Sequence, residues 1–185
     1  MTTTGVYNQS ALIELIRKHA LKFGEFQLAS GQTANFYLDC RKLTLTGEGA
    51  NMVAAGVIAE LESDWPDAVG GMAIGADPIT AAVVTCAGQM SRELRGFIVR
   101  KEAKAHGTGQ QVEGPVKPGD KAVIVEDVVT TGGSSIRAIE YAREFGLKID
   151  RAIAIVDRES GAADRFADVG VQLTSLVKLS ELKLD

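Results

Sequence analysis

The stretch "KAVIVEDVVTTGGSSIRAIEYAREFG", residues 121–146, decides the fold of this chain. It begins with an apolar run, which predicts a buried strand, and this run ends in two adjacent acids, Glu126 and Asp127. A segment rich in Thr, Gly and Ser follows, and helical spacing begins at about Gly133. A strand, a small-residue turn and a helix in this order form an anion site, because N–H groups at a helix start point toward the ligand.

The rest of the chain alternates between helical and strand patterns. Helices are predicted from Asn8 or Ser10 to about Lys22, over 47–63, from Pro78 onward, over 133–146 and over 173–182. Strands are predicted over 68–74, 94–100, 121–127 and 149–157. Short extended pieces are expected around the turn Ser30–Gly31, and a long loop is expected over 101–120. The strands are continuous apolar runs, which is typical of a parallel sheet buried on both faces. The sequence therefore predicts an α/β fold, with a parallel sheet core flanked by helices and ligands at the carboxyl ends of the strands.

Length and composition narrow the class of protein. The 185 residues, 45% hydrophobic and 24% charged, predict one domain over residues 1–185. A net charge of -4 gives no basic surface for nucleic acid, and the most apolar stretch, 68–88, is interrupted by Asp77 and Pro78, so no membrane span is expected. Cys40 and Cys86 stand far apart, which indicates buried small side chains in a cytoplasmic protein. No metal-ligand spacing is present.

The acids and the turn after them suit a ligand with two kinds of group. A phosphorylated sugar fits, with its phosphate in Thr130 to Ser134 and its hydroxyls on Glu126 and Asp127. A bare turn between strand and helix needs no ligand, but two adjacent acids are an unfavourable choice for a turn alone because like charges repel. A Walker loop would need a lysine before Ser or Thr, and a dinucleotide fingerprint would need G-x-G-x-x-G. Neither pattern is present.

The segment "VIVEDVVTTGGSS", residues 123–135, resembles the phosphoribosyl pyrophosphate (PRPP) motif of the type I phosphoribosyltransferases. The resemblance implies that family's fold, with a small N-terminal hood formed by about residues 1–45 and the C-terminus. It also implies that Glu126 and Asp127 hold the ribose hydroxyls. The other PRPP-binding residues that it implies in this segment are Val128, Val129, Thr130, Thr131, Gly132, Gly133 and Ser134.

A basic segment, "RKEAKAHGTGQQVEG" at residues 100–114, stands out in this acidic chain. A charge run is usually a solvated face. However, this run follows a predicted strand, and its glycines Gly107, Gly109 and Gly114 provide the joints of a closing lid. Cations carried by such a lid stabilise the charge that builds on a leaving pyrophosphate. The basic residues in question are Arg100, Lys101, Lys104 and His106.

This segment is similar to the catalytic loop of the orotate phosphoribosyltransferases. That resemblance implies that its four basic residues bind the pyrophosphate of PRPP. It names Lys104, as the general acid, together with His106 and Asp127 as the catalytic residues. It also implies a homodimer in which the loop closes over the active site of the other subunit. The polyphosphate substrate and the family together imply Mg²⁺ as cofactor.

Two further segments bear on the base that is transferred. "FQLASGQTANFYLDCRKL", residues 26–43, resembles the N-terminal signature of the orotate family and places Phe36 and Tyr37 near the pyrimidine, unless both are ordinary core aromatics. Arg158 follows the strand 149–157, and its guanidinium matches the carboxylate of orotate. It could instead be a surface arginine paired with Asp157 or Glu159. In the family, this Arg and the first Thr of the loop, here Thr130, contact orotate.

The chain departs from the family pattern at two places. Some relatives carry a lysine before the Ser–Gly turn, where this chain has Ala29, and another in the loop after the 68–74 strand. Any contact of Gly75 and Ala76 with an anion is then expected from backbone N–H groups.

The predicted function is orotate phosphoribosyltransferase, which makes orotidine 5′-monophosphate and pyrophosphate from PRPP and orotate in de novo UMP biosynthesis. Two alternatives remain at this stage. A sister transferase would use a purine or uracil, although a neutral base needs no guanidinium at Arg158. A PRPP-binding regulator would have kept the fold and lost the chemistry, and could dispense with Lys104 and His106.

Overall fold

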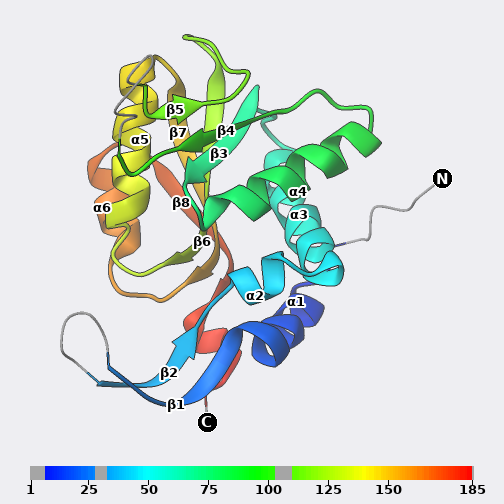
Figure 1. Ribbon diagram of the computed structural model, residues 1–185, viewed down its shortest axis with the longest axis vertical. Coiled ribbons are helices and arrows are strands. Elements are labelled where there is room, and N and C mark those ends of the chain that lie inside the picture. Colours follow the sequence, from blue (N-terminus) through cyan, green and yellow to red (C-terminus); the bar gives the residue numbers. More distant parts are fainter. Residues whose placement is uncertain (1–6, 28–32, 103–109, 185) are drawn as a thin grey trace.

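The structure, a computed structural model, describes residues 7–27, 33–102 and 110–184. Its centre is a sheet in which the described strands follow the order β5-β4-β3-β6-β7-β8 (Figure 1). Strands β3, β4, β6, β7 and β8 run parallel, and β5 pairs antiparallel with β4. The strand bounds are β3 Ala68–Met72, β4 Arg95–Val99, β5 Val112–Glu113, β6 Lys121–Val129, β7 Lys148–Asp157 and β8 Gln172–Lys178. The predicted α/β class is confirmed.

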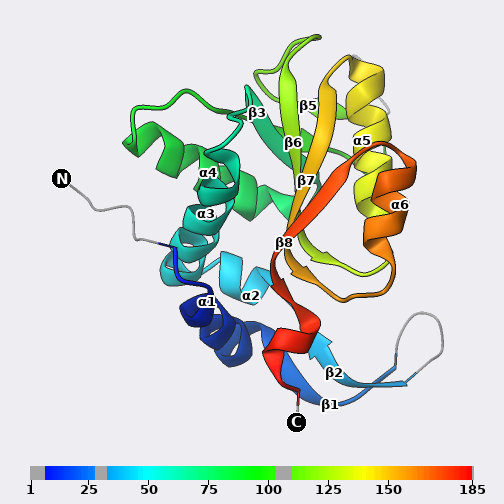
Figure 2. The same ribbon diagram turned by 180° about the vertical axis from the view of Figure 1, so that it is seen from behind.

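Helices cover both faces of this sheet (Figures 1 and 2). One face packs against α1 (Gln9–Leu15), which continues as a π-helical turn to Ala20, and against α3 (Gly47–Leu61) and α4 (Ala76–Gln89). The other face packs against α5 (Gly133–Phe145) and α6 (Ala162–Asp168). Both faces are therefore buried, which is why the strands read as continuous apolar runs. No helix among the described residues is long and apolar enough to cross a bilayer.

The C-terminal segment differs from the sequence prediction. Residues 173–182 were expected to be helical, and this expectation is wrong. Gln172–Lys178 forms β8, which extends the sheet beside β7, and only Leu179–Leu182 turns as a 3₁₀-helix. Pairing with a long neighbouring strand outweighs a weak local preference, because each added residue gains a backbone hydrogen bond and buried apolar area.

The chain adds strands to the sheet in opposite directions from β3 and from β6. From β3 the chain passes through α4 to β4 on one side, and from β6 it passes through α5 to β7 on the other. The pairing of β3 with β6 ends at Gly70 and Ile124, whereas β6 pairs with β7 as far as Val129. The carboxyl edge of the sheet therefore opens between β3 and β6, which is where open α/β sheets bind ligands.

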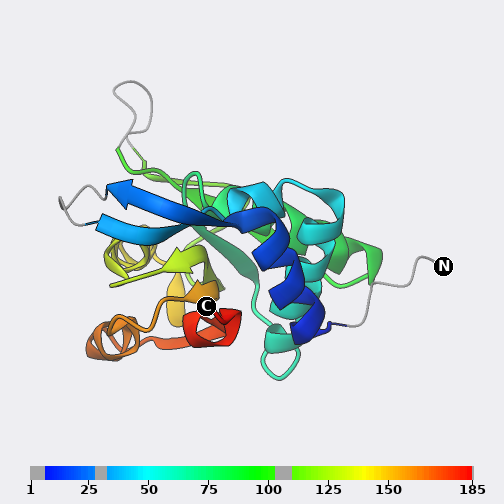
Figure 3. The ribbon, with the colours of Figure 1, turned by 90° about the horizontal axis from the view of Figure 1, so that it is seen from below.

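A second, smaller part of the chain lies beyond this carboxyl edge (Figures 1 and 3). Strands β1 (Leu21–Gln27) and β2 (Thr33–Leu38) pair antiparallel, and the short helix α2 (Arg41–Thr44) follows. Hydrogen bonds join the two ends of the chain here, because Tyr7 Oη and Gln9 Nε2 both donate to the carbonyl of Leu176, at 3.2 and 2.9 Å. The hairpin is thus held over the edge at which the predicted acids lie.

Candidate functional site

A pocket of about 280 Å³ opens at the carboxyl edge between β3 and β6. It brings together four parts of the chain that are distant in sequence: the hairpin with α2, the turn after β3, the segment after β4, and β6 with the start of α5. Residues of both charges line it. They are Tyr37, Leu38, Asp39, Arg41, Met72, Ala73, Ile74, Gly75, Lys101, Glu126, Asp127, Val128 and Ser134.

The adjacent acids Glu126 and Asp127 lie on strand β6 rather than after its end, because the strand continues to Val129. Both carboxylates line the pocket, and they lie close enough for the charge of Asp127 to act on Glu126, although each has its own partners. Glu126 Oε2 accepts hydrogen bonds from the hydroxyls of Ser134, at 3.1 Å, and Ser135, at 2.6 Å. Asp127 instead lies so close to Gly75 that a Cβ there would stand 2.8 Å from Asp127 Oδ1.

The environments of the two acids also differ. Burial raises the pKa of Glu126 to about 7; the nearby charge of Asp127 adds to the rise, and the hydroxyl of Ser135 opposes it. The side chain is buried, with an exposed fraction of 8%. A carboxyl group with this pKa carries its proton part of the time near neutral pH. The repulsion expected between neighbouring acids is thereby reduced.

The turn between β6 and α5 is fixed from behind by α6, a helix that the sequence analysis missed. Gly132 has a φ of 78°, and a Cβ on it would lie 2.6 Å from the ring of Phe166. Arg165 Nη1 donates to the carbonyl of Thr131 at 2.9 Å. Among the backbone hydrogen bonds outside helices and strands in the described residues, none is donated by an N–H of residues 131–135. These N–H groups can therefore receive an anion.

The end of β7 brings Arg158 beside this turn. Its backbone N–H donates to the carbonyl of Val129 at 2.9 Å, so Arg158 and Thr130 leave neighbouring strand ends. Its guanidinium carbon lies 5.2 Å from the centre of the Phe36 ring, within range of a cation–π interaction. The carboxylates of Asp157 and Glu159 accept instead from backbone N–H groups, of Glu159 and Ser180.

The two aromatic residues predicted near the base lie apart. Phe36 is half-buried beside Arg158, whereas Tyr37 is 42% exposed, lines the pocket and packs against Phe26. This is the alternation expected of neighbours on a strand. Neither side chain belongs to the buried core.

The basic residues of segment 100–114 are only partly placed. Lys101 lines the pocket, whereas Arg100 lies in an adjoining hollow and pairs with Glu113 at 3.2 Å. Lys104 and His106 lie outside the described residues. Of the remaining predicted PRPP residues, Val129 has its side chain buried in the core, so it could offer a ligand only backbone atoms.

The sequence analysis missed a charged pair in the pocket wall, Asp39 and Arg41. The Nε–H of Arg41 donates to Asp39 Oδ1 at 2.8 Å, and the hydrogen bond from Arg41 is the main reason that the pKa of Asp39 is lowered. The signal was an acid and a base two residues apart, directly after an aromatic strand, in a segment that otherwise reads as apolar.

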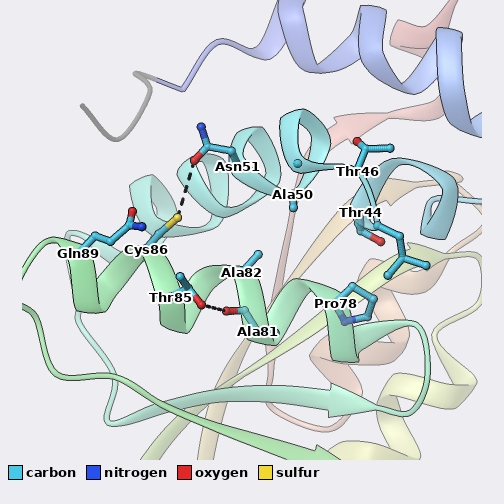
Figure 4. A pocket seen from close by; sticks show the side chains of 12 residues that line it. Thr44, Thr46, Ala50, Asn51, Pro78, Ala81, Ala82, Thr85, Cys86 and Gln89 are labelled. Atoms are coloured by element: carbon cyan, nitrogen blue, oxygen red, sulfur yellow. Dashed lines mark hydrogen bonds between the residues drawn. The ribbon is translucent and has the colours of Figure 1, made fainter. Parts of the chain in front are cut away.

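A second hollow, of about 510 Å³, lies between α4 and the segment that joins α2 to α3 (Figure 4). Threonine, alanine and amide side chains line it, among them Thr46, Ala82 and Gln89, and none of its lining residues is charged. The hydroxyl of Thr85 donates to the carbonyl of Ala81 at 2.8 Å, one turn earlier in α4, so this hydrogen bond uses its donor within the helix. This hollow offers no cation for a phosphate, so the pocket at the carboxyl edge is the candidate site.

Comparisons with known proteins show which family this chain resembles. The model of the phosphoribosyl transferase domain family matches residues 78–178. The chain is 51% identical over 180 residues to the orotate phosphoribosyltransferase of Rhodopirellula baltica, a match that covers 94% of this chain and 93% of that protein. It is 39% identical over 174 residues to the orotate phosphoribosyltransferase of Aquifex aeolicus, with 92% and 95% covered.

Solved structures give the same result. The fold superposes on orotate phosphoribosyltransferase from Mycobacterium tuberculosis H37Rv in complex with Fe(III) dicitrate, with a TM-score of 0.85, 34% identity, and 95% of this chain and 99% of that chain covered. A structure of the same enzyme in complex with PRPP gives a TM-score of 0.80 at 30% identity, again with 95% and 99% covered.

Proposed function

The chain belongs to the phosphoribosyltransferase family, and on that premise we propose how its residues share the work of the reaction. The reaction is that of an orotate phosphoribosyltransferase, a step in the synthesis of UMP. A bond forms between N1 of orotate and C1 of the ribose, while the N1–H bond and the bond from C1 to the pyrophosphate oxygen break. The proton released from N1 balances the one that the departing oxygen takes up. Pyrophosphate leaves with the electron pair, and the product is orotidine 5′-monophosphate.

PRPP is held by β6 and the turn that follows it. The 5′-phosphate binds the backbone N–H groups and hydroxyls of the turn 130–134, and the ribose hydroxyls bind Asp127 and Glu126. The observation that carries this assignment is the position of the Asp127 carboxylate in the pocket wall, directly before a turn with unused N–H groups. Asp127 also stabilises positive charge on the ribose ring as the bond to pyrophosphate breaks.

Orotate binds between the hairpin and the end of β7. Arg158 takes its carboxylate, Thr130 contacts it from the start of the turn, and Phe36 and Tyr37 lie near the ring. Support comes from the distance of 5.2 Å between Arg158 and the Phe36 ring and from the partners of Asp157 and Glu159, which leave the guanidinium to a ligand. A guanidinium is well suited to a planar carboxylate because two parallel hydrogen bonds can form.

The pyrophosphate group faces the basic residues. Lys101 lines the pocket, and its ammonium forms no ion pair within the described ranges. Arg100, Lys104 and His106 complete the set, with Lys104 as the general acid that protonates the departing oxygen and His106 beside it. Closing this segment over the pocket also excludes water, which would otherwise hydrolyse PRPP.

Mg²⁺ fits as an ion that arrives with PRPP. Within the described parts of the chain, no three His, Cys, Asp or Glu side chains gather into a metal cluster. The pocket wall nevertheless offers the carboxylates of Asp127 and Asp39, and Mg²⁺ is usually held by one or two carboxylates together with substrate phosphates. We assign Asp127 as the ligand; when bound, the ion neutralises charge on the phosphate oxygens.

We further propose one domain over residues 1–185, with about residues 1–45 and the C-terminus as a hood, working as a homodimer in the cytoplasm. The bonds from Tyr7 and Gln9 to Leu176 support the hood.

Leu45 and Ile74, exposed by 73% and 64%, would be covered by a second subunit. Free thiols at Cys40 and Cys86 suit a reducing compartment. Light scattering during gel filtration tests the dimer.

The loss of orotate absorbance on mixing protein, PRPP, Mg²⁺ and orotate tests the proposed function. Parallel samples contain uracil or hypoxanthine in place of orotate. We expect orotate alone to be consumed. Consumption of a neutral base would contradict the role of Arg158, and binding of PRPP without consumption of any base would favour a regulator.

A further inference from the structure

One wall of the pocket is formed by the pair Asp39 and Arg41, which no part of the PRPP motif contains. Besides the bond from Arg41 Nε, the Nη2 of Arg41 donates to Asp39 Oδ2 at 3.2 Å, so the two planar groups meet side by side. The backbone N–H of Arg41 adds a bond of 3.2 Å to Oδ1. Asp39 is itself fixed, because its backbone N–H donates to the carbonyl of Ala20 at 2.9 Å. The guanidinium is therefore held in one orientation.

This pairing leaves donors on Arg41 for a ligand. A guanidinium carries five N–H bonds, and Asp39 occupies two of them. The Arg41 side chain is 41% exposed where it lines the pocket. Hydrogen bonding to Asp39 is the main reason that the pKa of Arg41 is raised, and the charge of Asp127 also contributes. Arg41 and Asp127 thus face a common space.

Further lysines lie near the pair or face the pocket. Lys22 and Lys42 lie next to each other, since contact with the Lys42 ammonium lowers the pKa of Lys22. Lys101 faces the pocket from the segment after β4. The turn at residues 73–75, which also lines the pocket, supplies only Ala, Ile and Gly. Among the described residues, the cations in direct contact with the pocket are therefore Arg41 and Lys101.

A purely structural role for the pair explains less. Half-exposed ion pairs contribute little to stability, and α2, which begins at Arg41, has only four residues. A solvated arginine would also lose little by pointing into water. Instead it lies in the wall of a pocket, with its fork fixed by a carboxylate, and this is how proteins present an arginine to phosphate oxygens.

We propose that Arg41 binds the pyrophosphate group of PRPP and that Asp39 is the residue that positions it. The inference rests on the proposed function, since it assigns a partner to one part of the same substrate. With the 5′-phosphate on the turn after β6 and the ribose at Asp127, the pyrophosphate is directed toward the wall that carries Arg41 and Lys101. Charge builds on its oxygens as it leaves, so a fixed cation there stabilises the transition state as well as the bound substrate.

Three variants test this inference: Arg41→Gln, Arg41→Lys and Asp39→Asn. Calorimetry measures binding of PRPP and of inorganic pyrophosphate, each with Mg²⁺ and without orotate, and steady-state assays give KM for PRPP and for orotate separately. We expect Arg41→Gln to weaken binding of both phosphates about 10- to 100-fold, the effect of losing charged hydrogen bonds. Asp39→Asn should weaken it several-fold, because the guanidinium remains but is no longer held.

Arg92→Gln is the matched control. Arg92 is also a partly exposed, paired arginine, with Nη1 3.0 Å from Glu62 Oε1 and its guanidinium stacked 3.5 Å from the Trp65 ring, but it does not line the pocket. Its replacement should leave both phosphate affinities unchanged. Arg41→Lys keeps the charge without the fork, so partial recovery relative to Arg41→Gln is expected. It also serves if Arg41→Gln fails to fold, as judged by circular dichroism.

The outcomes separate the two proposals. Phosphate affinities of Arg41→Gln, or of Arg41→Lys if only that variant folds, within twofold of the parent protein would overturn the role of Arg41. An equal rise of KM for orotate and for PRPP would also overturn it, because that indicates general damage to the site. If the parent protein binds pyrophosphate through Arg41 but consumes no orotate, the inference stands and the proposed function fails.

Discussion

Two segments line the same pocket but are built in different ways. In residues 126–135 the groups that meet the ligand follow one another along the chain, and the Glu126 carboxylate has its partners within the segment, the hydroxyls of Ser134 and Ser135. In residues 36–41 the Asp39–Arg41 pair is local, but the segment is placed by contacts with distant parts of the chain. Phe36 meets Arg158, and Asp39 is fixed by Ala20.

The difference indicates a division of roles. A segment whose groups follow one another on a strand of the central sheet and the turn after it can hold the reacting sugar to within a fraction of an ångström, as catalysis requires. A segment carried on a hairpin that contacts other elements is suited to binding the outer parts of the substrates. Substitutions in residues 126–135 are therefore expected to change kcat and stability. Those in residues 36–41 are expected to change mainly KM, with Arg41 also affecting kcat because it faces the leaving pyrophosphate.

The largest effect is expected from Asp127→Asn. The amide keeps an oxygen for the Val128 N–H, which now donates to Asp127 Oδ1 at 2.8 Å, so the fold should be retained. The negative charge that stabilises the ribose ring in the transition state is lost. We expect kcat to fall about 10²- to 10³-fold, the usual result of removing one such electrostatic group. Steady-state kinetics at saturating PRPP and orotate measure it.

Asp67→Asn is the control for this change. Asp67 Oδ2 also accepts a backbone N–H of β6, from Lys121 at 2.8 Å, but it does so at the opposite edge of the sheet. Its replacement should leave kcat near the parent value. A kcat for Asp127→Asn within threefold of the parent value would contradict the proposed division of roles. Residues 126–135 would then bind the substrate without taking part in the chemistry.

The sequence predicted the local segment and the family well. The strand, turn and helix of 121–146, the sheet class, the enzyme family and the reaction are all confirmed. These features depend on residues close together in sequence, where a hydrophobic period and a motif carry the information. The strand continues two residues beyond Asp127, and this was missed because the two acids interrupt the apolar run, although Val128 and Val129 favour a strand.

What was missed depends on tertiary contacts. β8 was predicted as a helix because its apolar spacing is ambiguous until β7 pairs with it. The helix α6 was not predicted, although it fixes the turn through Phe166 and Arg165. Arg41 carries no motif of its own and gains its place only when the hairpin closes over the sheet. The roles of Lys104 and His106 stay predictions, since these residues lie outside the described ranges.

A second prediction concerns Glu126→Gln and the pH dependence of stability. The pKa of Glu126 is raised to about 7 in the folded protein from an ordinary value of 4.5, so folding favours its protonated form. The stability that this provides is complete below about pH 4.5 and is lost as the pH rises to 7. The parent protein should therefore lose about 3 kcal/mol relative to the variant between pH 4.5 and 8, by denaturant unfolding.

Glu140→Gln is the control, because it removes one negative charge from the exposed face of α5, the helix that follows β6. Its unfolding free energy should change with pH as that of the parent protein does. If the difference in unfolding free energy between the parent and Glu126→Gln is equal at pH 5 and pH 8, Glu126 is not held in the protonated form. The closeness of two acids on β6 would then need another explanation.

The smallest effect is expected from Phe36→Leu, in the segment that depends on distant contacts. Leucine keeps most of the apolar bulk but removes the ring beneath Arg158, and a partly exposed cation–π interaction contributes about 0.5–1 kcal/mol. KM for orotate should rise about two- to fivefold while kcat and KM for PRPP stay within error. Phe23→Leu is the control, because Phe23 lies opposite Phe36 in the hairpin but is 61% exposed. A loss of kcat in Phe36→Leu would mean that the hairpin positions the reacting atoms. Residues 36–41 would then share the role assigned to residues 126–135, and the contrast between the two segments would be wrong.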